Sequence, residues 1–307
     1  MMTYRGLFRT GLARAFSNSI YQKPEIKDPK DFNPSDKTSW WDSMPKHQTM
    51  FDPVTMKMAH PTYDMKEIEE VDITHLKPKT FTDKWARISI NLMRSSFDLA
   101  TSYRDGNMNE EKWLTRVIFL ETVAGVPGFV GAMCRHLRSL RTLKRDNGWI
   151  NHLLGEAENE RQHLVTFMEM KKPGRVFRFF LLAGQGVYMN MYFFFYLMAP
   201  KTCHRFVGYL EEEAVKTYTH LIHEIDHGNM KHWAATPATM ESKQYWDLPA
   251  DATLRDVVLA IRADEAIHRE FNHHLADVDS SMLIPHVAVT TKSPMAMRYH
   301  GNEGRSH

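Results

Sequence analysis

Glutamate and histidine recur three residues apart at four places in this chain, and that spacing places both side chains on one face only if the backbone is helical. On an α-helix, each Glu-x-x-His pair lies about one turn apart and presents a carboxylate and an imidazole to the same ion. The four pairs are Glu160/His163, Glu224/His227, Glu265/His268 and Glu270/His273. Chance yields about one such pair in a chain of this composition, so spacing alone does not select the functional pairs.

The sequence around these pairs also favours helices. Apolar residues recur at helical spacing, strand-like alternation is scarce, and the glycine-rich nucleotide-binding and Gly-x-Ser-x-Gly motifs are absent. Breaks are expected at Pro200, at Gly228 and, within the second stretch, around Pro127. The predicted fold class is therefore all-α, with helical stretches at 83–104, 109–145, 148–171, 175–199, 203–227 and 253–278.

Position along these helices separates the four pairs. The first and third pairs lie mid-helix, in GEAENERQHL and IRADEAIHRE, where two side chains are held rigidly. Glu224/His227 lies at a helix end, and Glu270 is offset from Glu265 by five residues, so its pair does not face the same site equally well. The two mid-helix pairs are the preferred metal ligands.

Further carboxylates are needed if two metal ions share one bundle. Glu121 is the only charge between Arg116 and Arg135, and a buried lone carboxylate is costly unless it is paired, with Arg116 for example, or bound to metal. The triplet EEE at 211–213 points in three directions, so at most two of its acids enter the core. The alternative for that triplet is a solvated turn near a helix N-terminus.

Composition narrows the choice of metal. Two cysteines, Cys134 and Cys203, exclude a disulfide-dense scaffold, an all-cysteine zinc site and a cysteine-ligated iron–sulfur cluster within one chain. Four carboxylates and two imidazoles balance two divalent ions and suit oxygen chemistry at iron. We therefore expect a ferritin-like four-helix di-iron bundle that uses two Fe ions and no haem. The net charge of +2 argues against a nucleic-acid-binding protein.

The stretch 179–199 carries no charged side chain and is long enough to span a bilayer. Gln185, Asn190 and three tyrosines make a membrane span less favoured. The alternatives are a buried core helix and a helix that lies in the membrane interface. A single span here would put the predicted ligands before and after it on opposite sides of the membrane. The interfacial interpretation is favoured, and two membrane-interface helices are expected beside the bundle.

The N-terminus resembles a targeting signal. Residues 1–24 contain arginine but no acidic residue, which is typical of a mitochondrial transit peptide, and a disordered basic tail is the alternative. Residues 25–82 are rich in proline, lysine and aspartate and are expected to form an extended arm. The di-iron helical bundle domain is expected at 83–290, followed by a C-terminal tail at 291–307.

Four segments together resemble one family. FLETVAGVPG at 119–128, EAENERQHL at 156–164, YLEEEAVKTYTHLI at 209–222 and RADEAIHRE at 262–270 are similar, in order and spacing, to the alternative oxidases. The resemblance covers roughly residues 70–290. It implies a non-proton-pumping ubiquinol oxidase that couples the oxidation of two ubiquinols to the reduction of O2 to water. It also implies a monotopic homodimer on the matrix side of the mitochondrial inner membrane, in contact with its lipid.

The resemblance implies roles for individual residues. It selects Glu211 from the triplet and gives the metal ligands as Glu121, Glu160, His163, Glu211, Glu265 and His268. It implies Tyr218 as a catalytic tyrosine beside the irons, and Asn159, Asp264 and Trp246 as residues that orient the histidine ligands. It places Arg94, Phe97, Arg116, Glu213 and Thr217 in the quinol pocket.

The sequence departs from the family pattern at Gln162, Lys216 and Ile267, and none of these departures removes a ligand. No cysteine precedes Cys134, so the regulatory cysteine of the plant-type arm is absent and disulfide control is not expected. Two other functions use the same bundle. One is a di-iron hydroxylase or desaturase acting on a membrane-soluble carbon substrate, and the other is a ferritin-like iron binder without turnover.

Overall fold

The computed structural model describes residue 60 and residues 63–103, 108–171 and 173–284. The predicted transit peptide at 1–24, most of the arm expected at 25–82 and the tail at 291–307 lie outside these residues. Their assignments, and the domain boundaries drawn from them, stay predictions.

Every regular secondary-structure element in the described residues is an α-helix, which confirms the all-α fold class. One isolated antiparallel bridge joins Pro237 and Thr253. The helices are α2 (Met65–Glu69), α3 (Phe81–Ala100), α4 (Glu110–Ala124), α5 (Val126–Thr142), α6 (Trp149–Met170), α7 (Arg175–Met198), α8 (Pro200–Asp226), α9 (Lys231–Ala235), α10 (Met240–Trp246) and α11 (Leu254–Asp277).

The six predicted stretches correspond to α3, the α4–α5 pair, α6, α7, α8 and α11, while the short helices α2, α9 and α10 were not expected. Helix α2 lies within the segment expected to be extended, where the Asp64 side chain accepts a hydrogen bond from the Lys66 amide and caps the helix. Helix α3 begins two residues earlier than predicted, because Thr80 and Asp83 form a capping box at its start.

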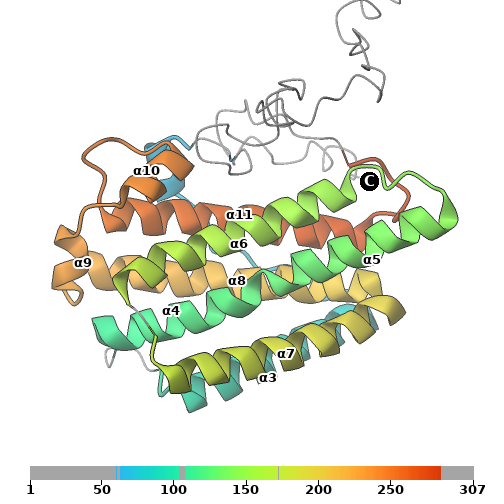
Figure 1. Cartoon of the computed structure of the whole chain (residues 1–307), viewed down its shortest axis with the longest axis horizontal. Coiled ribbons are helices and arrows are strands. Elements are labelled where there is room, and N and C mark those ends of the chain that lie inside the picture. The colour runs from blue at the N-terminus through green and yellow to red at the C-terminus, as the bar shows by residue number, and fades with distance from the viewer. Residues whose placement is uncertain (1–59, 61–62, 104–107, 172, 285–307) are drawn as a thin grey trace, which may run out of the picture. The chain divides into compact units, whose positions relative to one another are not determined.

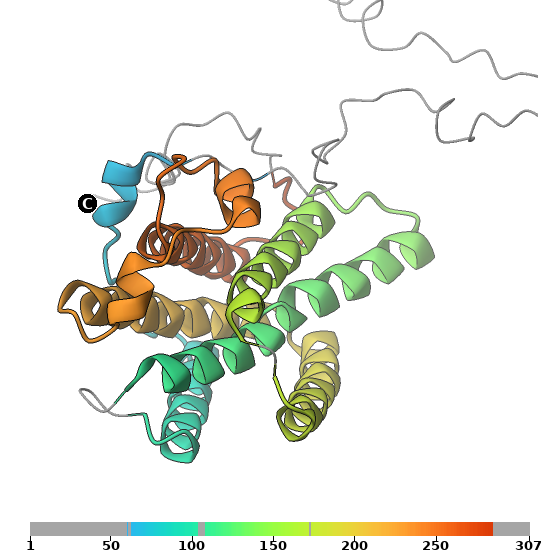
Figure 2. The same ribbon diagram turned by 60° about the vertical axis from the view of Figure 1, so that its left-hand side comes forward.

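Helices α4, α6, α8 and α11 form a four-helix bundle, which Figures 1 and 2 show from two sides. Helices α8 and α11 make the most extensive pair, and α6 packs against both α4 and α5. The largest apolar core lies between α4, α6, α8 and α11, and Trp113, Phe167 and Leu221 are completely buried in it. The carboxylates and histidines selected from the sequence lie on these four helices.

The predicted break in the second stretch lies at Gly125, where α4 ends and α5 begins. A methyl group at Gly128 would lie 2.6 Å from the Leu153 carbonyl oxygen of α6, and one at Gly125 would lie 3.2 Å from the Ala157 carbonyl oxygen. Only glycine therefore allows α5 to approach α6 this closely. The approach brings Glu121, at the end of α4, towards Glu160 of α6.

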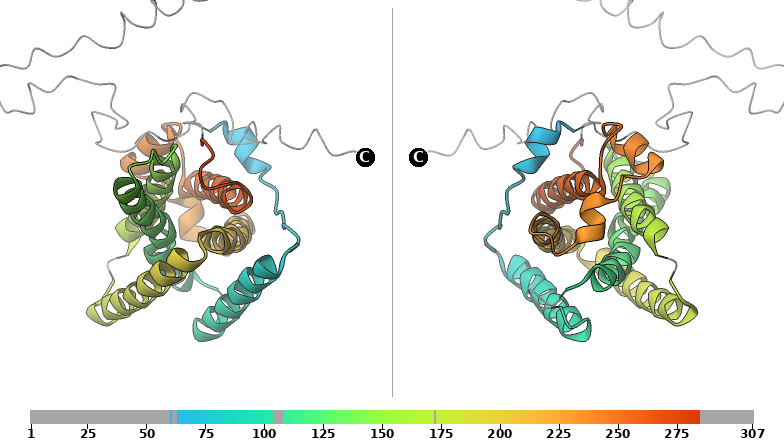
Figure 3. Two further views of the ribbon diagram at one scale, coloured as in Figure 1. Left: turned by 90° about the vertical axis from the view of Figure 1, so that its right-hand side faces the viewer. Right: turned by 90° about the vertical axis from the view of Figure 1, so that its left-hand side faces the viewer.

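Helices α3 and α7 lie at the same edge of the bundle and diverge from one another, with α3 packed on α8 and α7 mainly on α5 (Figures 1 and 3). Their outward side chains are largely apolar and exposed: Phe81, Trp85, Ile88, Leu92 and Leu99 on α3, and Val176, Phe179, Phe180, Leu182, Val187, Phe194, Leu197 and Met198 on α7. Only the tyrosines Tyr188, Tyr192 and Tyr196 of α7 are buried against the bundle.

Among the described residues, one helical segment is long and apolar enough to cross a membrane by length and composition, namely Glu110–Thr142. More than half of its most apolar window is buried, because α4 and α5 pack against α6 and α7. The uncharged stretch 179–199 of α7 is not among such segments.

Replacing Gly128 by alanine is expected to lower the free energy of unfolding by about 1–3 kcal/mol, because the new methyl group meets the backbone of α6. Urea unfolding followed by circular dichroism measures the change. The matched control is Gly155→Ala on α6, where nothing lies within 4 Å of the added methyl group, so stability is expected to rise by roughly 0.5–1 kcal/mol. Equal stability of Gly128→Ala and the wild type would contradict the close approach.

Candidate metal centre

Six buried side chains from four helices meet in the centre of the bundle. They are Glu121 from α4, Glu160 and His163 from α6, Glu211 from α8, and Glu265 and His268 from α11. They form two groups of four that share Glu160 and Glu265, and in each group the potential ligand atoms lie within 4.8 Å of one another. Two such groups with two carboxylates in common could hold a pair of metal ions.

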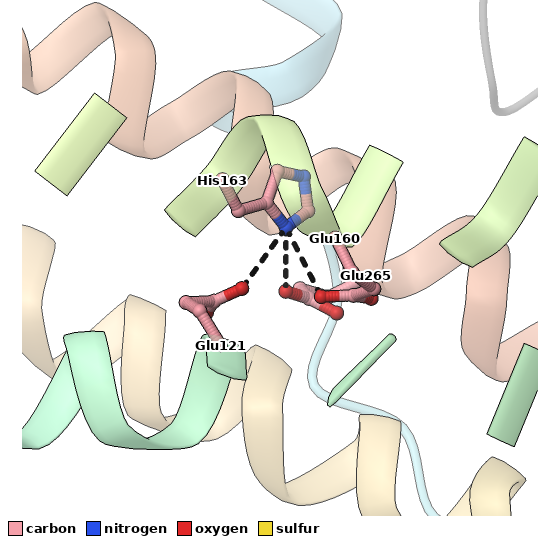
Figure 4. Close-up of side chains that lie close together, drawn as sticks. All are labelled: Glu121, Glu160, His163 and Glu265. Carbon is pink, nitrogen blue, oxygen red and sulfur yellow. Dashed lines mark ion pairs between the residues drawn. The ribbon is translucent and has the colours of Figure 1, made fainter. Parts of the chain in front are cut away.

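Figure 4 shows one of the two groups, with the Nδ1 atom of His163 facing three carboxylates. This nitrogen lies 3.3 Å from Glu265 Oε1, 3.4 Å from Glu160 Oε2 and 3.5 Å from Glu121 Oε2. In the other group, His268 Nδ1 lies 2.8 Å from Glu160 Oε1 and 3.7 Å from Glu265 Oε2. Ligand atoms bound about 2.0–2.2 Å from one ion lie roughly 3 Å apart, so these separations fit cation binding.

The inward atoms of this cluster lack hydrogen-bond partners. The buried atoms without a partner include Glu121 Oε2, both carboxylate oxygens of Glu160, Glu265 Oε2, and the Nδ1 atoms of His163 and His268. Buried polar atoms are almost always hydrogen-bonded, since an unsatisfied one costs about 1–3 kcal/mol and more when charged. Six such atoms aimed at each other fit a pair of divalent cations that the four carboxylates would neutralise.

Without a cation, the ionisation of these groups is strongly perturbed. Burial raises the pKa of Glu121 to about 8 and raises that of Glu211 well above its usual value, and nearby carboxylates add to both shifts. Burial would also raise the pKa of Glu160, but its contacts with His163 and His268 lower it instead. Burial opposes protonation of both histidines, yet the hydrogen bond from His163 to Asp264 and the nearby cluster carboxylates, Glu160 foremost for His268, raise their pKa values.

Asp264 holds the outer side of His163. Its Oδ2 atom accepts hydrogen bonds from His163 Nε2 at 2.9 Å, Asn159 Nδ2 at 3.0 Å and Trp246 Nε1 at 2.9 Å. Burial would raise the pKa of Asp264, but the charges and hydrogen bonds of His60 and His163 hold it well below its usual value. An ionised carboxylate there fixes the ring of His163 with Nδ1 turned to the cluster. The structure thus brings together Asn159, Asp264 and Trp246.

Two residues at this site were not expected from the sequence. His60 Nε2 lies 2.9 Å from Asp264 Oδ1, and the Tyr63 hydroxyl donates to the same oxygen. Both belong to the segment predicted as an arm, about 200 residues from Asp264 in sequence, and neither lies in a recognisable motif. No signal within the sequence alone indicates that these side chains reach the bundle.

Tyr218 lies on the inner face of α8, seven residues after Glu211. Its hydroxyl donates to Glu121 Oε1, and only 3% of the residue is exposed. Burial raises the pKa of Tyr218 well above its usual value, and the neighbouring carboxylates raise it further. The tyrosine is therefore a neutral hydrogen-bond donor next to the candidate ligands.

The acidic triplet on α8 is not a solvated turn. Glu211 faces the cluster, while the buried Glu212 accepts from the Leu76 amide at 2.8 Å and contacts His75 and His273. Glu213 pairs with Arg87, Arg94 and Lys216. Two of the three acids are thus buried, as the sequence allows, and each has a different set of partners.

The two pairs set aside from the sequence lie elsewhere. Glu224 accepts a hydrogen bond from Asn229, and His227 caps the end of α8. Glu270 is paired with its neighbour Arg269, and His273 turns to Glu212.

A family model described as "Alternative oxidase" matches residues 63–277, more than half of the chain and all four helices that carry the cluster. The chain belongs to the alternative oxidase family. It is 45% identical over 260 residues to "Alternative oxidase, mitochondrial" of Emericella nidulans, covering 81% of this chain and 73% of that protein. It is 46% identical over 257 residues to the protein of the same name from Aspergillus niger, covering 80% and 73%. For Wickerhamomyces anomalus the identity is 49% over 236 residues, covering 72% and 69%.

Membership in the alternative oxidase family makes the chain an oxidoreductase and confirms the resemblance found in the sequence. The residues that this resemblance places in a quinol pocket also lie together. Arg94 of α3 donates to Glu213 and, at 3.1 Å, to Thr217 Oγ1. The guanidinium of Arg116 lies over the Phe97 ring at 4.7 Å. It pairs with Asp98 and not with Glu121, which has no arginine partner among the described residues.

The Asp264→Asn variant is expected to bind iron about 10–100-fold more weakly than the wild type. Both oxygens of Asp264 accept hydrogen bonds, but the asparagine side chain has only one oxygen and one NH2 group. The NH2 group would face donors on either side, namely His163, Asn159 and Trp246, or His60 and Tyr63. Metal titration and iron analysis of the purified protein measure the loss. The control is Asp226→Asn, which breaks only an exposed pair with Arg255, and equal iron affinity in the two variants would contradict the role of Asp264.

The metal-free protein is expected to become less stable as the pH rises from about 5 to 8. Glu121, Glu156 and Glu211 keep their protons to a higher pH when folded, as do His163 and His268. These five groups outweigh His204, whose pKa burial lowers to about 4, so in this window the folded state binds more protons than the unfolded state. Glu160 and Asp264 have lowered pKa values, so in the folded protein they take up protons only below this window. There the folded state loses stability as the pH falls.

Urea unfolding of the chelator-treated protein across this range measures the effect. The iron-loaded protein serves as the comparison and is expected to show a flatter profile, because bound cations replace the protons. A metal-free protein that is more stable at the upper end of the range than at the lower end would contradict this assignment of protons.

Proposed function

We propose that the chain is a mitochondrial ubiquinol oxidase that couples the oxidation of two ubiquinols to the four-electron reduction of O2 to water at a di-iron carboxylate centre. The six buried side chains that converge from four helices carry this proposal, because they suit two divalent cations and because six of their inward atoms have no hydrogen-bond partner among the described residues. Family membership supports it, since the relatives are named mitochondrial alternative oxidases.

In this proposal Glu121, Glu160, His163, Glu211, Glu265 and His268 would hold two iron ions. Bound there, the irons supply the redox chemistry that reduces O2. The protein holds the ligands in a water-poor interior and orients His163 through Asp264. Tyr218 is the proposed catalytic tyrosine, because its hydroxyl proton is already directed at Glu121 Oε1.

Ubiquinol is proposed to bind where α3, α4 and α8 meet. A quinol has an aromatic ring with hydroxyl groups, and this region offers both stacking and hydrogen-bonding partners. Phe97 stacks on Phe119 with 5.3 Å between ring centroids, and Arg94, Glu213 and Thr217 form a hydrogen-bonded group beside them. Thr217 lies one residue before Tyr218, so the same turn of α8 reaches both the quinol region and the candidate irons.

The protein is proposed to bind one leaflet of the inner membrane from the matrix side, as a homodimer, without spanning it. Helix α7 joins α6 to α8, and both of these helices supply ligands to one cluster, so α7 starts and ends on the same side of any membrane it contacts. The exposed apolar side chains of α3 and α7 support an interfacial position. With no membrane-crossing proton path proposed, the oxidation is not expected to pump protons.

Oxygen uptake by membranes that contain the protein, with a short-chain ubiquinol and cyanide present, tests the proposal. Ubiquinol is expected to disappear at about two molecules per O2, giving two ubiquinones and two waters, since four electrons reduce O2 and each quinol carries two. No uptake by protein that holds two irons would contradict it, and an oxygenated or desaturated product would favour a di-iron hydroxylase or desaturase.

The Glu211→Ala variant is expected to lose oxidation to below about one-hundredth of the wild-type rate, because one of the two metal groups loses a carboxylate. The assay is the same oxygen uptake, normalised to protein content. Glu270→Ala is the matched control, since this exposed glutamate of α11 pairs only with Arg269, and its rate is expected to equal that of the wild type. Near-normal uptake by Glu211→Ala would contradict the ligand assignment.

A further inference from the structure

A cavity of about 270 Å³ lies between the start of α3, the start of α8 and the end of α11, away from the metal cluster. Three lysines contribute to its wall: Lys77 and Lys79 from the segment before α3, and Lys201 from the first turn of α8. Among the described residues, no ion pair or hydrogen bond is recorded for any of the three ammonium groups. Three cationic groups gathered at one cavity, none of them in an ion pair within the described part of the chain, favour an anionic ligand.

The other charged groups of the cavity are one arginine and two aspartates, which pair with one another. Arg205 is buried and binds Asp83 at 3.0 Å, and it also pairs with Asp277 and contacts His273. Both aspartates contact Arg205 rather than a lysine, and four cationic groups against two carboxylates leave the lining with an excess of positive charge. The hydroxyl-bearing residues Thr80, Thr82 and Thr202 complete the polar lining. Ammonium and hydroxyl groups together are suited to phosphate oxygens.

The cavity adjoins the apolar edge formed by α3 and α7. Helix α3 begins directly after Thr80, and α7 ends three residues before Lys201. The two helices touch at this end, where the ring centroids of Trp85 and Phe195 lie 6.1 Å apart. Phe81 next to the cavity is 79% exposed, and Met198 is 72% exposed. Figure 3 shows both helices at the same edge of the bundle.

We propose that this cavity binds the phosphate headgroup of an anionic phospholipid, whose acyl chains lie along the exposed apolar side chains of α3 and α7. The inference rests on the interfacial membrane position in the proposed function. The volume supports a headgroup, because pockets that enclose whole small-molecule ligands are typically about 300–1,000 Å³. Cationic side chains at a cavity beside exposed apolar helices match the two parts of such a lipid.

Vesicle binding by the full-length, iron-loaded protein tests the proposal. The variant carries Lys77→Gln, Lys79→Gln and Lys201→Gln, and the matched control removes the same charge at Lys66, Lys144 and Lys231, which are exposed elsewhere. Both are compared with the wild type on vesicles of phosphatidylcholine alone and of phosphatidylcholine mixed with phosphatidylglycerol. Flotation measures the bound fraction, and circular dichroism verifies that each protein is folded.

The wild type is expected to prefer the mixed vesicles, and the cavity variant to lose that preference by on the order of 100-fold, about 1 kcal/mol for each lysine near an anionic surface. Its binding to neutral vesicles and its ubiquinol oxidation in detergent are expected to be unchanged, as are all properties of the control. Equal losses in the two variants would show that the lysines act only through net charge, which contradicts a built site.

Two further outcomes would overturn the lipid assignment in different ways. Calorimetry with glycerol 3-phosphate and inorganic phosphate measures binding without a membrane, and tight, lysine-dependent binding of either would make the cavity a site for a small soluble anion. Failure of the wild type to bind any vesicle would remove the membrane position together with this site. Ubiquinol oxidation in detergent would then still test the proposed activity separately.

Discussion

The rest of this structure depends on the burial of four carboxylates and two imidazoles at the centre of a helical bundle. Ionised groups in a low-dielectric interior destabilise a fold by several kcal/mol each unless opposite charge compensates them. The surrounding protein compensates only their outer sides, through Asp264 on His163 and Tyr218 on Glu121. Among the described residues, six of the atoms that face the centre of the cluster have no hydrogen-bond partner. A fold that concentrates negative charge in this way is completed by binding cations.

Local packing is arranged around this cluster. Glycine at 125 and 128 lets the second helical stretch approach α6, which brings Glu121 within reach of His163. The long α8 turns its three consecutive acids to three environments: the cluster, the arm and α11, and the arginines of α3. One helix therefore joins the candidate metals to the segment that precedes the bundle and to the proposed quinol region.

Much of the fold and of the ligand set was predictable from sequence, because both depend on helical spacing. The mid-helix Glu-x-x-His pairs and the lone charge at Glu121 are local patterns, and the helices place them as that spacing requires. The choice among Glu211, Glu212 and Glu213 was not predictable from periodicity, since two of them are buried and differ only in what α11 and the arm present to them. His60 and Tyr63 were missed because long-range contacts of an irregular segment leave no periodic signal.

The contact between the arm and Asp264 joins two processes that are usually considered separately. Asp264 accepts from His60 and Tyr63 on one oxygen and supports His163 through the other. By thermodynamic reciprocity, whatever the docked arm adds to the affinity of the centre for its ions, the bound ions add to the docking of the arm. Bound ions would then slow protease cleavage near residue 60, so the rate of cleavage there would report whether the metal centre is occupied.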